Sequence, residues 1–173
     1  MKKITRLFIA AIAVMGFSAD ASAQQTSSAS ANTSATIIQP IAIVKSADLS
    51  FGNVAVHSTN AGTVALSTGG GRTAGGGVTL PATTGTVTAA EFEVTGAPNY
   101  TYSISLPSSV TLDDNNAHTM TVNTFVSNPA TTGTLDGSGE QTISVGATLQ
   151  VAGGQAPGTY ESDTDFQVTV NYN

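Results

Sequence analysis

The stretch ISVGATLQV, residues 143–151, alternates apolar side chains with polar or small ones without a break. Successive side chains of a β-strand point to opposite faces of its sheet, so this alternation places one face in a core and the other in water. Residues 100–106 and 166–172 repeat the pattern, with an apolar side chain at every second position. The three stretches predict strands that are each buried on one side.

Shorter alternating runs and turn signals fill the rest of the chain after residue 36. Gly-rich, Asp-Asn and Pro-Gly clusters separate the runs, and no stretch shows helical spacing over more than two turns. Thr is abundant, and its β-branched side chain suits a half-exposed strand better than a helix surface. The sequence therefore predicts an all-β, immunoglobulin-like antiparallel β-sandwich of roughly eight to ten short strands, with a closed barrel as the alternative.

The first 23 residues have the three parts of a secretory signal. Met1–Arg6 is basic, Leu7–Phe17 is apolar, and Ala21, Ser22 and Ala23 form a small-residue cleavage site before Gln24. The apolar run is too short to cross about 30 Å of hydrocarbon as a helix. We expect an exported protein of the periplasm, cell surface or extracellular space, with no membrane insertion after cleavage.

Charge and cysteine content exclude several classes of function. After residue 23 the only basic side chains are Lys45 and Arg72, against ten carboxylates, for a net charge of about −8. Such a chain has too few cations to neutralise a row of phosphates, which disfavours nucleic acid as a partner, and it has no polybasic patch for a membrane surface. The absence of Cys excludes thiol catalysis and disulfides.

The remaining chain divides into an arm and one domain. Residues 24–35 are small and uncharged, which predicts a flexible polar arm, and residues 36–173 form a single β-sandwich domain. The domain begins with the apolar run Ile37–Val44, which Pro40 interrupts. Proline removes a ladder donor, so this strand belongs at an edge or at a break between sheets. Both parities of the run are apolar, which predicts burial on both sides or insertion into a groove.

No group of residues has the pattern of a catalytic or cofactor site. His57 and His118 are the only histidines, and neither has a metal ligand at a suitable spacing. No G-x-S-x-G elbow accompanies them, so a secreted hydrolase that uses either histidine ranks last among the hypotheses. The sequence predicts exposed polar histidines, a non-enzymatic protein and no cofactor.

Two other clusters have structural explanations. Glu161, Asp163 and Asp165 are predicted to share one solvated face on the approach to the last strand, and Asp113–Asn116 to form a turn. Weak calcium binding near Asp113 or Asp163 stays an open alternative. Gly69–Gly77 lacks the Lys and the following helix of a phosphate-binding loop and predicts a mobile loop between two strands.

The two ends of the domain resemble a known family. The stretches are ATIIQP (35–40) and DLSFGNV (48–54) at its start, and VGATL (145–149), GTY (158–160) and FQVTVNYN (166–173) at its end. They resemble an exported bacterial domain family of unknown function, from about Ala35 to Asn173. The resemblance implies no activity.

The last strand also resembles that of chaperone–usher pilus subunits. Phe166, Val168, Val170 and Tyr172 alternate, Tyr172 is penultimate, and Gly158 precedes them. The resemblance implies pairing of this strand with a periplasmic chaperone and donation of an N-terminal arm to the next subunit. The arm would be Gln24–Val44, and its large apolar residues are Ile37, Ile38, Ile41 and Ile43.

Together these features predict a non-enzymatic exported structural protein, a fimbria-like or pilus-like subunit at the cell surface. Its partners would be copies of itself or other surface subunits and a periplasmic chaperone. A free-standing secreted binding module for carbohydrate or protein is the second hypothesis. That module would expose aromatic side chains on one face, for which Tyr100, Tyr102 and Tyr160 are the candidates.

Overall fold

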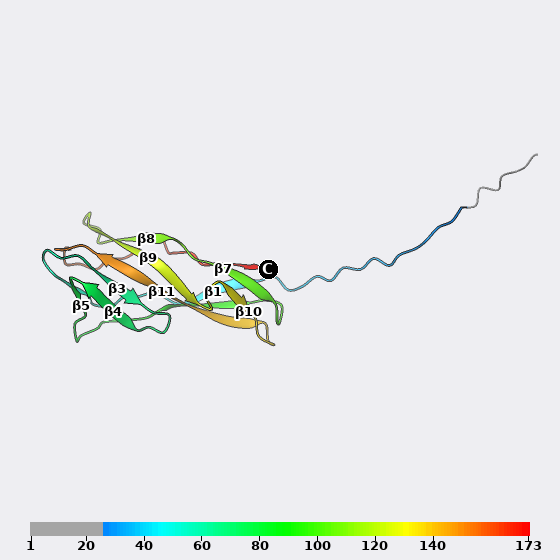
Figure 1. Ribbon diagram of the computed structural model, residues 1–173, viewed down its shortest axis with the longest axis horizontal. Coiled ribbons are helices and arrows are strands. Elements are labelled where there is room, and N and C mark those ends of the chain that lie inside the picture. The colour runs from blue at the N-terminus through cyan, green and yellow to red at the C-terminus, as the bar shows by residue number, and fades with distance from the viewer. Residues whose placement is uncertain (1–25) are drawn as a thin grey trace, which may run out of the picture. The chain divides into compact units, whose positions relative to one another are not determined.

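Strands are the only regular secondary structure in residues 26–173, the part of the chain that the computed structural model describes (Figure 1). The predicted signal peptide and the first two residues of the arm lie outside the described residues. Thr26–Thr36 contains no strand and its side chains are exposed, while Ile37–Asn173 forms the β-domain. Within the described part, no helix is long and apolar enough to cross a membrane.

The domain has twelve strands. They are β1 Ala42–Ala47, β2 Ala55–Val56, β3 Gly62–Leu66, β4 Arg72–Gly76, β5 Val78–Thr79, β6 Ala90–Thr95, β7 Thr101–Ser105, β8 Ser109–Asp113, β9 Thr119–Asn128, β10 Thr132–Thr134, β11 Glu140–Val151 and β12 Thr169–Tyr172. Several of the twelve have only two or three residues, too few to show alternation, and this explains why the expected eight to ten is too low. The prediction of an all-β antiparallel sandwich is confirmed.

The longest strand, β11, organises the large sheet. Residues 140–145 of β11 pair with β6 and residues 147–151 pair with β3, while residues 144–150 pair with β9 on the other side. All five apolar side chains of the 143–151 alternation are buried, at no more than 5% exposure each. A β-bulge marks the point where β11 changes neighbours, because the register with β9 shifts between Gly146 and Thr148. A Cβ at Gly146 would lie 2.2 Å from the Leu66 carbonyl oxygen, so this crossing requires glycine.

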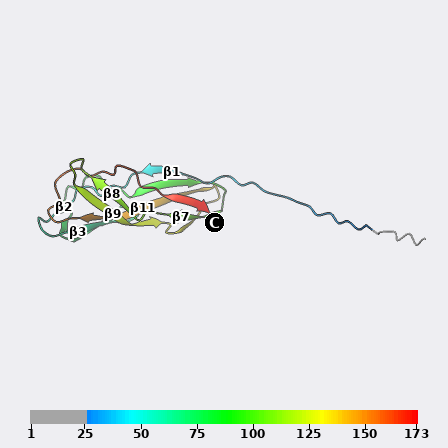
Figure 2. The same ribbon diagram turned by 90° about the horizontal axis from the view of Figure 1, so that it is seen from above.

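Two smaller sheets complete the sandwich. One has the order β10-β7-β12 and the other pairs β2 with β5. In Figure 2 β12 is the red arrow that ends at the C-terminus. The first core cluster joins β6 and β11 to β7 and β12 through Phe92, Ile143, Tyr102 and Val170. The second cluster joins β3, β9 and β11 to Phe51 and Val78. Burial of these two clusters holds the sheets face to face.

The Gly69–Gly77 segment is not the single mobile loop that its composition predicted. Arg72–Gly76 forms β4 and pairs with β3 over its whole length, so only the residues around Gly70 and Gly77 turn. A Cβ at Gly62 would lie 2.3 Å from the Gly75 carbonyl oxygen, so the glycines permit close approach of backbones. Arg72 Nη1 also donates to the main-chain oxygens of Phe51 at 2.5 Å and Asn53 at 2.9 Å.

The first apolar run differs from its prediction in extent and burial. The strand β1 begins at Ala42, so Pro40 precedes it, and β1 lies at an edge of the large sheet. Burial on both sides is wrong: Ile41 and Ile43 are half-buried, but Val44 is 65% exposed and Ile37 is 97% exposed. One face of the run packs on the domain and the other has no cover within the described residues.

The contact between Gly133 and Tyr102 gives a stability test. Tyr102 is fully buried and its hydroxyl donates to Gln141 Oε1 at 2.6 Å. A Cβ at Gly133 would lie 2.3 Å from the Tyr102 ring, so Gly133→Ala should cost about 1–3 kcal/mol of unfolding free energy, measured by urea denaturation. Gly137→Ala is the matched control, since a Cβ there meets no atom within 4 Å. Equal stability of the two variants would contradict this packing.

Candidate assembly surface

The first strand and the C-terminal segment run beside each other in opposite directions. At one end Lys45 Nζ lies 3.6 Å from Asp165 Oδ2, and at the other the Tyr172 hydroxyl donates to the Gln39 carbonyl oxygen at 2.9 Å. Between these points β1 pairs only with β6, and β12 pairs only with β7. No main-chain hydrogen bond joins the two segments in the described chain. We call the strip between residues 39–47 and residues 165–172 the seam.

Apolar side chains from both segments line the seam. Ile41 and Ile43 come from one side, and Phe166, Val168 and Tyr172 come from the other. All five pack against the first core cluster and all remain half-buried, whereas Val170 is only 8% exposed. The Phe166 ring also lies 5.9 Å from that of Phe92 and 5.2 Å from that of Phe125. The structure thus brings together six of the nine residues that the sequence suggested for assembly.

The other three residues lie apart from the seam cluster. Ile37 is almost fully exposed and Ile38 is half-buried, and neither belongs to a core cluster. Gly158 is an exposed loop residue that lies beside the Asp114 side chain. The predicted continuous last strand is shorter than expected, because β12 begins at Thr169. Burial still alternates from Phe166 to Tyr172, as predicted.

The hydroxyl of Tyr172 connects three parts of the chain. It accepts a hydrogen bond from the Ala97 amide at 2.6 Å and donates to Gln39, so it joins β12, the β6–β7 turn and the entry to β1. Its ring packs edge-on against Tyr100 at 5.7 Å. A Cβ at Gly96 would lie 2.2 Å from the Tyr172 oxygen, so glycine makes room for it. Sequence patterning identified Tyr172 as a strand residue but gave no signal for this polar connection.

Lys45 forms the charged end of the seam. Its Nζ lies 2.5 Å from Asp48 Oδ1 and 3.6 Å from Asp165 Oδ2. The hydrogen bond and charge of Asp48, and then the charge of Asp165, raise the pKa of Lys45 above its ordinary value. All three side chains are largely exposed, so water screens the attraction and the ion pairs orient the segments more than they stabilise them.

The two histidines are not assembled into a catalytic group in the described chain. His57 is exposed, and its Nδ1 accepts a hydrogen bond from the Thr59 amide at 3.2 Å. His118 Nδ1 lies 2.7 Å from Asp114 Oδ2 at the tip of the β8–β9 hairpin, and no serine or threonine hydroxyl among residues 26–173 is hydrogen-bonded to it. Both are exposed, as predicted.

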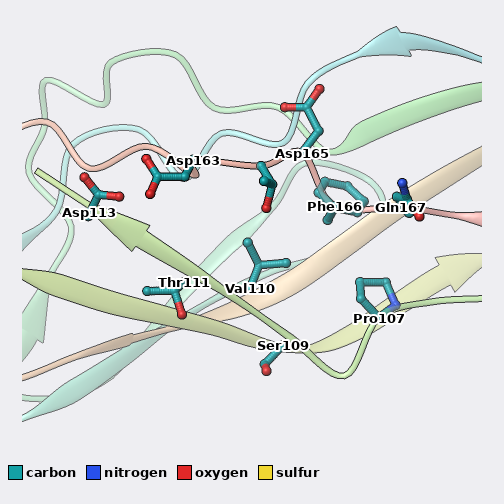
Figure 3. Close-up of a pocket in the computed structure, with 10 residues that line it drawn as sticks. Pro107, Ser109, Val110, Thr111, Asp113, Asp163, Asp165, Phe166 and Gln167 are labelled. Atoms are coloured by element: carbon teal, nitrogen blue, oxygen red, sulfur yellow. The ribbon is translucent and has the colours of Figure 1, made fainter. Parts of the chain in front are cut away.

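The carboxylates near the last strand, Glu161, Asp163 and Asp165, are all exposed, as predicted. Glu161 pairs with Asp113 through the main chain, Asp163 and Asp165 both line a cleft beside β8 (Figure 3), and Asp165 Oδ2 also lies 3.6 Å from Lys45 Nζ. Within residues 26–173 no group of three His, Cys, Asp or Glu side chains is placed to hold a metal ion. Asp113 and Asp163 line one cleft in the described chain, and weak calcium binding near them stays a prediction.

The candidate aromatic residues for a carbohydrate platform do not form one. Tyr102 is fully buried in the first core cluster, and the Tyr160 hydroxyl donates to the Ala156 carbonyl oxygen within its own loop. Only Tyr100, 45% exposed, presents much of its ring to solvent, and its neighbour is Tyr172. The three rings therefore cannot stack on one ligand.

Comparison with known proteins gives one match. A family model described as a domain of unknown function, DUF4402, matches residues 41–172. No curated protein and no solved structure matches the chain.

Removal of the Tyr172 hydroxyl should destabilise the domain. In Tyr172→Phe the buried Ala97 amide loses its acceptor, and an unpaired buried donor costs about 1–3 kcal/mol of unfolding free energy. Tyr100→Phe removes a hydroxyl that makes no hydrogen bond in the described chain and should change the unfolding free energy by less than about 0.5 kcal/mol. Urea denaturation of both variants measures the difference, and similar values would contradict the connecting role of Tyr172.

Asp114 should make stability sensitive to acid. Burial raises its pKa, but hydrogen bonds from His118 and from the Asn116 and His118 amides outweigh burial and leave the pKa below its ordinary value. Asp114 therefore contributes its full stabilisation above the pKa that its carboxyl has in the unfolded chain, near 4. This contribution is lost as pH falls through the lower pKa that Asp114 has in the folded protein. Asp114→Asn should lower the melting temperature at neutral pH and flatten its fall below about pH 4. Asp163 is the control, because its carboxylate accepts no hydrogen bond in the described chain, and Asp163→Asn should keep the fall of melting temperature in acid. Parallel curves of melting temperature against pH for the unaltered protein and Asp114→Asn would contradict the assignment.

Proposed function

Because the chain belongs to the DUF4402 family, whose description assigns no activity, we propose its function from the seam: an exported structural subunit that assembles at the cell surface by strand addition. The observation that carries the proposal is the pairing state of β1 and β12. Both strands are edges, they flank one apolar strip, and within residues 26–173 no main-chain hydrogen bond crosses that strip. Unpaired edges with apolar neighbours are templates for an added strand.

The geometry of the seam restricts the strand that enters it. Some Cα atoms of β1 and β12 lie within 8 Å of each other, whereas a strand hydrogen-bonded to both requires about 9.5 Å between them. The seam must therefore widen, and the core beneath it is already filled by Ile43, Val168 and Val170. An entering strand with small inward side chains requires the least displacement of this packing.

The arm of the chain has the side chains that this restriction demands. Thr26–Thr36 is uncharged and its described residues are exposed and outside any strand. Its alanines, at positions 29, 31 and 35, share one parity with Thr33 and Ile37, while the other parity carries Ser28, Ser30, Asn32, Ser34 and Thr36. An extended arm therefore presents one small, mostly apolar face and one polar face. We assign the donor role to residues 26–37 of a second copy, because β1 itself is already part of the subunit's own sheet.

Deletion of the arm tests the proposal without damage to the domain. Residues 24–173 should form concentration-dependent oligomers that run as ladders on unboiled gels and dissociate on heating, whereas residues 37–173 should remain monomeric with an unchanged melting temperature. Equilibrium ultracentrifugation measures both states. A monomer from residues 24–173 at millimolar concentration would contradict strand addition between copies.

Disulfide trapping locates the contact, because the chain has no cysteine of its own. A copy with Ser34→Cys, on the polar face of the arm, mixed with a copy with Asn171→Cys on the exposed side of β12, should form a disulfide-linked pair under mild oxidation. The matched control is Ser138→Cys, in an exposed turn that does not line the seam. Equal trapping of Asn171→Cys and Ser138→Cys would show random collision.

A further inference from the structure

A second unpaired edge belongs to β8 and is independent of the seam. Asp113 and Glu161 exchange two main-chain hydrogen bonds, from amide to carbonyl oxygen, at 2.8 and 2.9 Å. After Glu161 the C-terminal segment makes no further bridge to β8, and residues 162–168 form no strand. Residues 109–112 therefore have no main-chain partner on this side in the described chain.

The direction of the free main-chain groups follows from the pairing on the other side. Neighbouring residues of an antiparallel strand direct their amide and carbonyl groups to opposite edges. Asp114 donates to His118 across the hairpin, and Asp113 bonds to Glu161 on the outer edge. By the same alternation the main-chain amide and carbonyl of Leu112 point towards β9. Those of Ser109 and Thr111 point to the outer edge, like those of Asp113.

A cleft of about 570 Å³ lies along this free edge. Its walls are β8 on one side and residues 163–167 on the other, with Pro107 at one end (Figure 3). Val110 and Phe166 give it an apolar part, and the Asp113 and Asp163 carboxylates lie together at the end away from Pro107. The exposed edge of residues 109–112 is about 13 Å long, which matches four residues of an extended chain.

Charge selects the occupant of the cleft. Asp113, Asp163 and Asp165 are among its lining residues, and no Lys, Arg or His is. Asp165 faces Lys45, but the other two carboxylates have no cationic partner in the described chain. A segment that brings a cation to Asp113 and Asp163 gains attraction, whereas an acidic segment is repelled.

We propose that this cleft binds an extended, basic segment of a partner protein as an added antiparallel strand on β8. The main chain of the segment pairs with Ser109 and Thr111, on the same edge of β8 where Glu161 pairs with Asp113. An apolar side chain of the segment covers Val110 and Phe166, and a Lys or Arg side chain lies between Asp113 and Asp163. The binding mode is strand addition with charge selection.

A basic peptide tests the site in the intact mature chain. The probe is the acetylated and amidated peptide TKVKVT, titrated into isotope-labelled residues 24–173 at low salt. The amide signals of Ser109 and Thr111 should shift, the Thr111 amide should exchange more slowly with solvent, and added salt should weaken binding. The matched peptide TEVEVT should not bind, and a basic peptide with alternate amides methylated should bind at least about tenfold more weakly, since it cannot pair with the edge.

Variants separate main-chain pairing from charge. Thr111→Pro removes the outward amide without removing a bond to β9 and should weaken binding at least about tenfold, whereas Thr111→Ala should not. Asp113→Asn with Asp163→Asn should weaken binding by a similar factor, and Glu91→Gln, an exposed carboxylate outside the cleft, should not. If Thr111→Pro fails to fold, slower exchange of the Thr111 amide in the unaltered protein decides the same question. Equal binding of the two peptides, or no response at Ser109 and Thr111, would overturn the proposal.

Discussion

The pairing of β11 with three other strands is the constraint on which the rest of the structure depends. One edge of β11 pairs with β6 and then with β3, and its other edge pairs with β9. A single strand therefore contributes side chains to both core clusters. Slipping its register by one residue would turn every buried side chain of the 143–151 alternation to the opposite face. The bulge does not break that alternation, because its extra residue lies on β9: from the Gly146–Val126 pair to the Thr148–Asn123 pair the register advances two residues on β11 and three on β9. The other sheets pack on the face that β11 defines.

Local patterns predicted the class of the fold but not its connections. Alternation over 143–151, 100–106 and 166–172 identified the buried faces, except that Tyr100 at the start of one run is 45% exposed, because alternation depends only on neighbouring residues. It could not identify β4, whose glycines resemble a loop and form a strand only because β3 lies alongside. In the same way, the Tyr172 hydroxyl meets Gln39 and Ala97 through packing that brings together residues more than seventy positions apart. The apolar residues of the seam were predicted, whereas the absence of main-chain pairing between its two edges follows from topology alone.

The scarcity of cations has a structural consequence. The Arg72 guanidinium donates hydrogen bonds to the main-chain oxygens of Phe51 and Asn53, and the Lys45 ammonium lies between Asp48 and Asp165. Both basic side chains of the domain therefore make contacts within it, and the remaining surface carboxylates define its electrostatic field. A negative field favours cationic partners and discourages contact between identical faces unless uncharged main-chain and apolar groups supply the attraction. The seam satisfies that condition because its central residues are uncharged, whereas the cleft beside β8 does not.

The edge of β1 shows how an open strand is kept selective. Natural edge strands are protected by proline, lysine and bulges, which prevent indiscriminate pairing. β1 has all three: Pro40 lies before it, Lys45 lies near its end, and its register with β6 is irregular between Lys45 and Ala47. These features lie at the two ends and leave only Ile41–Val44 unprotected, a length that pairs with few residues of another chain. A long flat edge would promote aggregation, whereas a short apolar interval between protected ends accepts only a strand whose inward side chains are small enough to fit over the packed core beneath it.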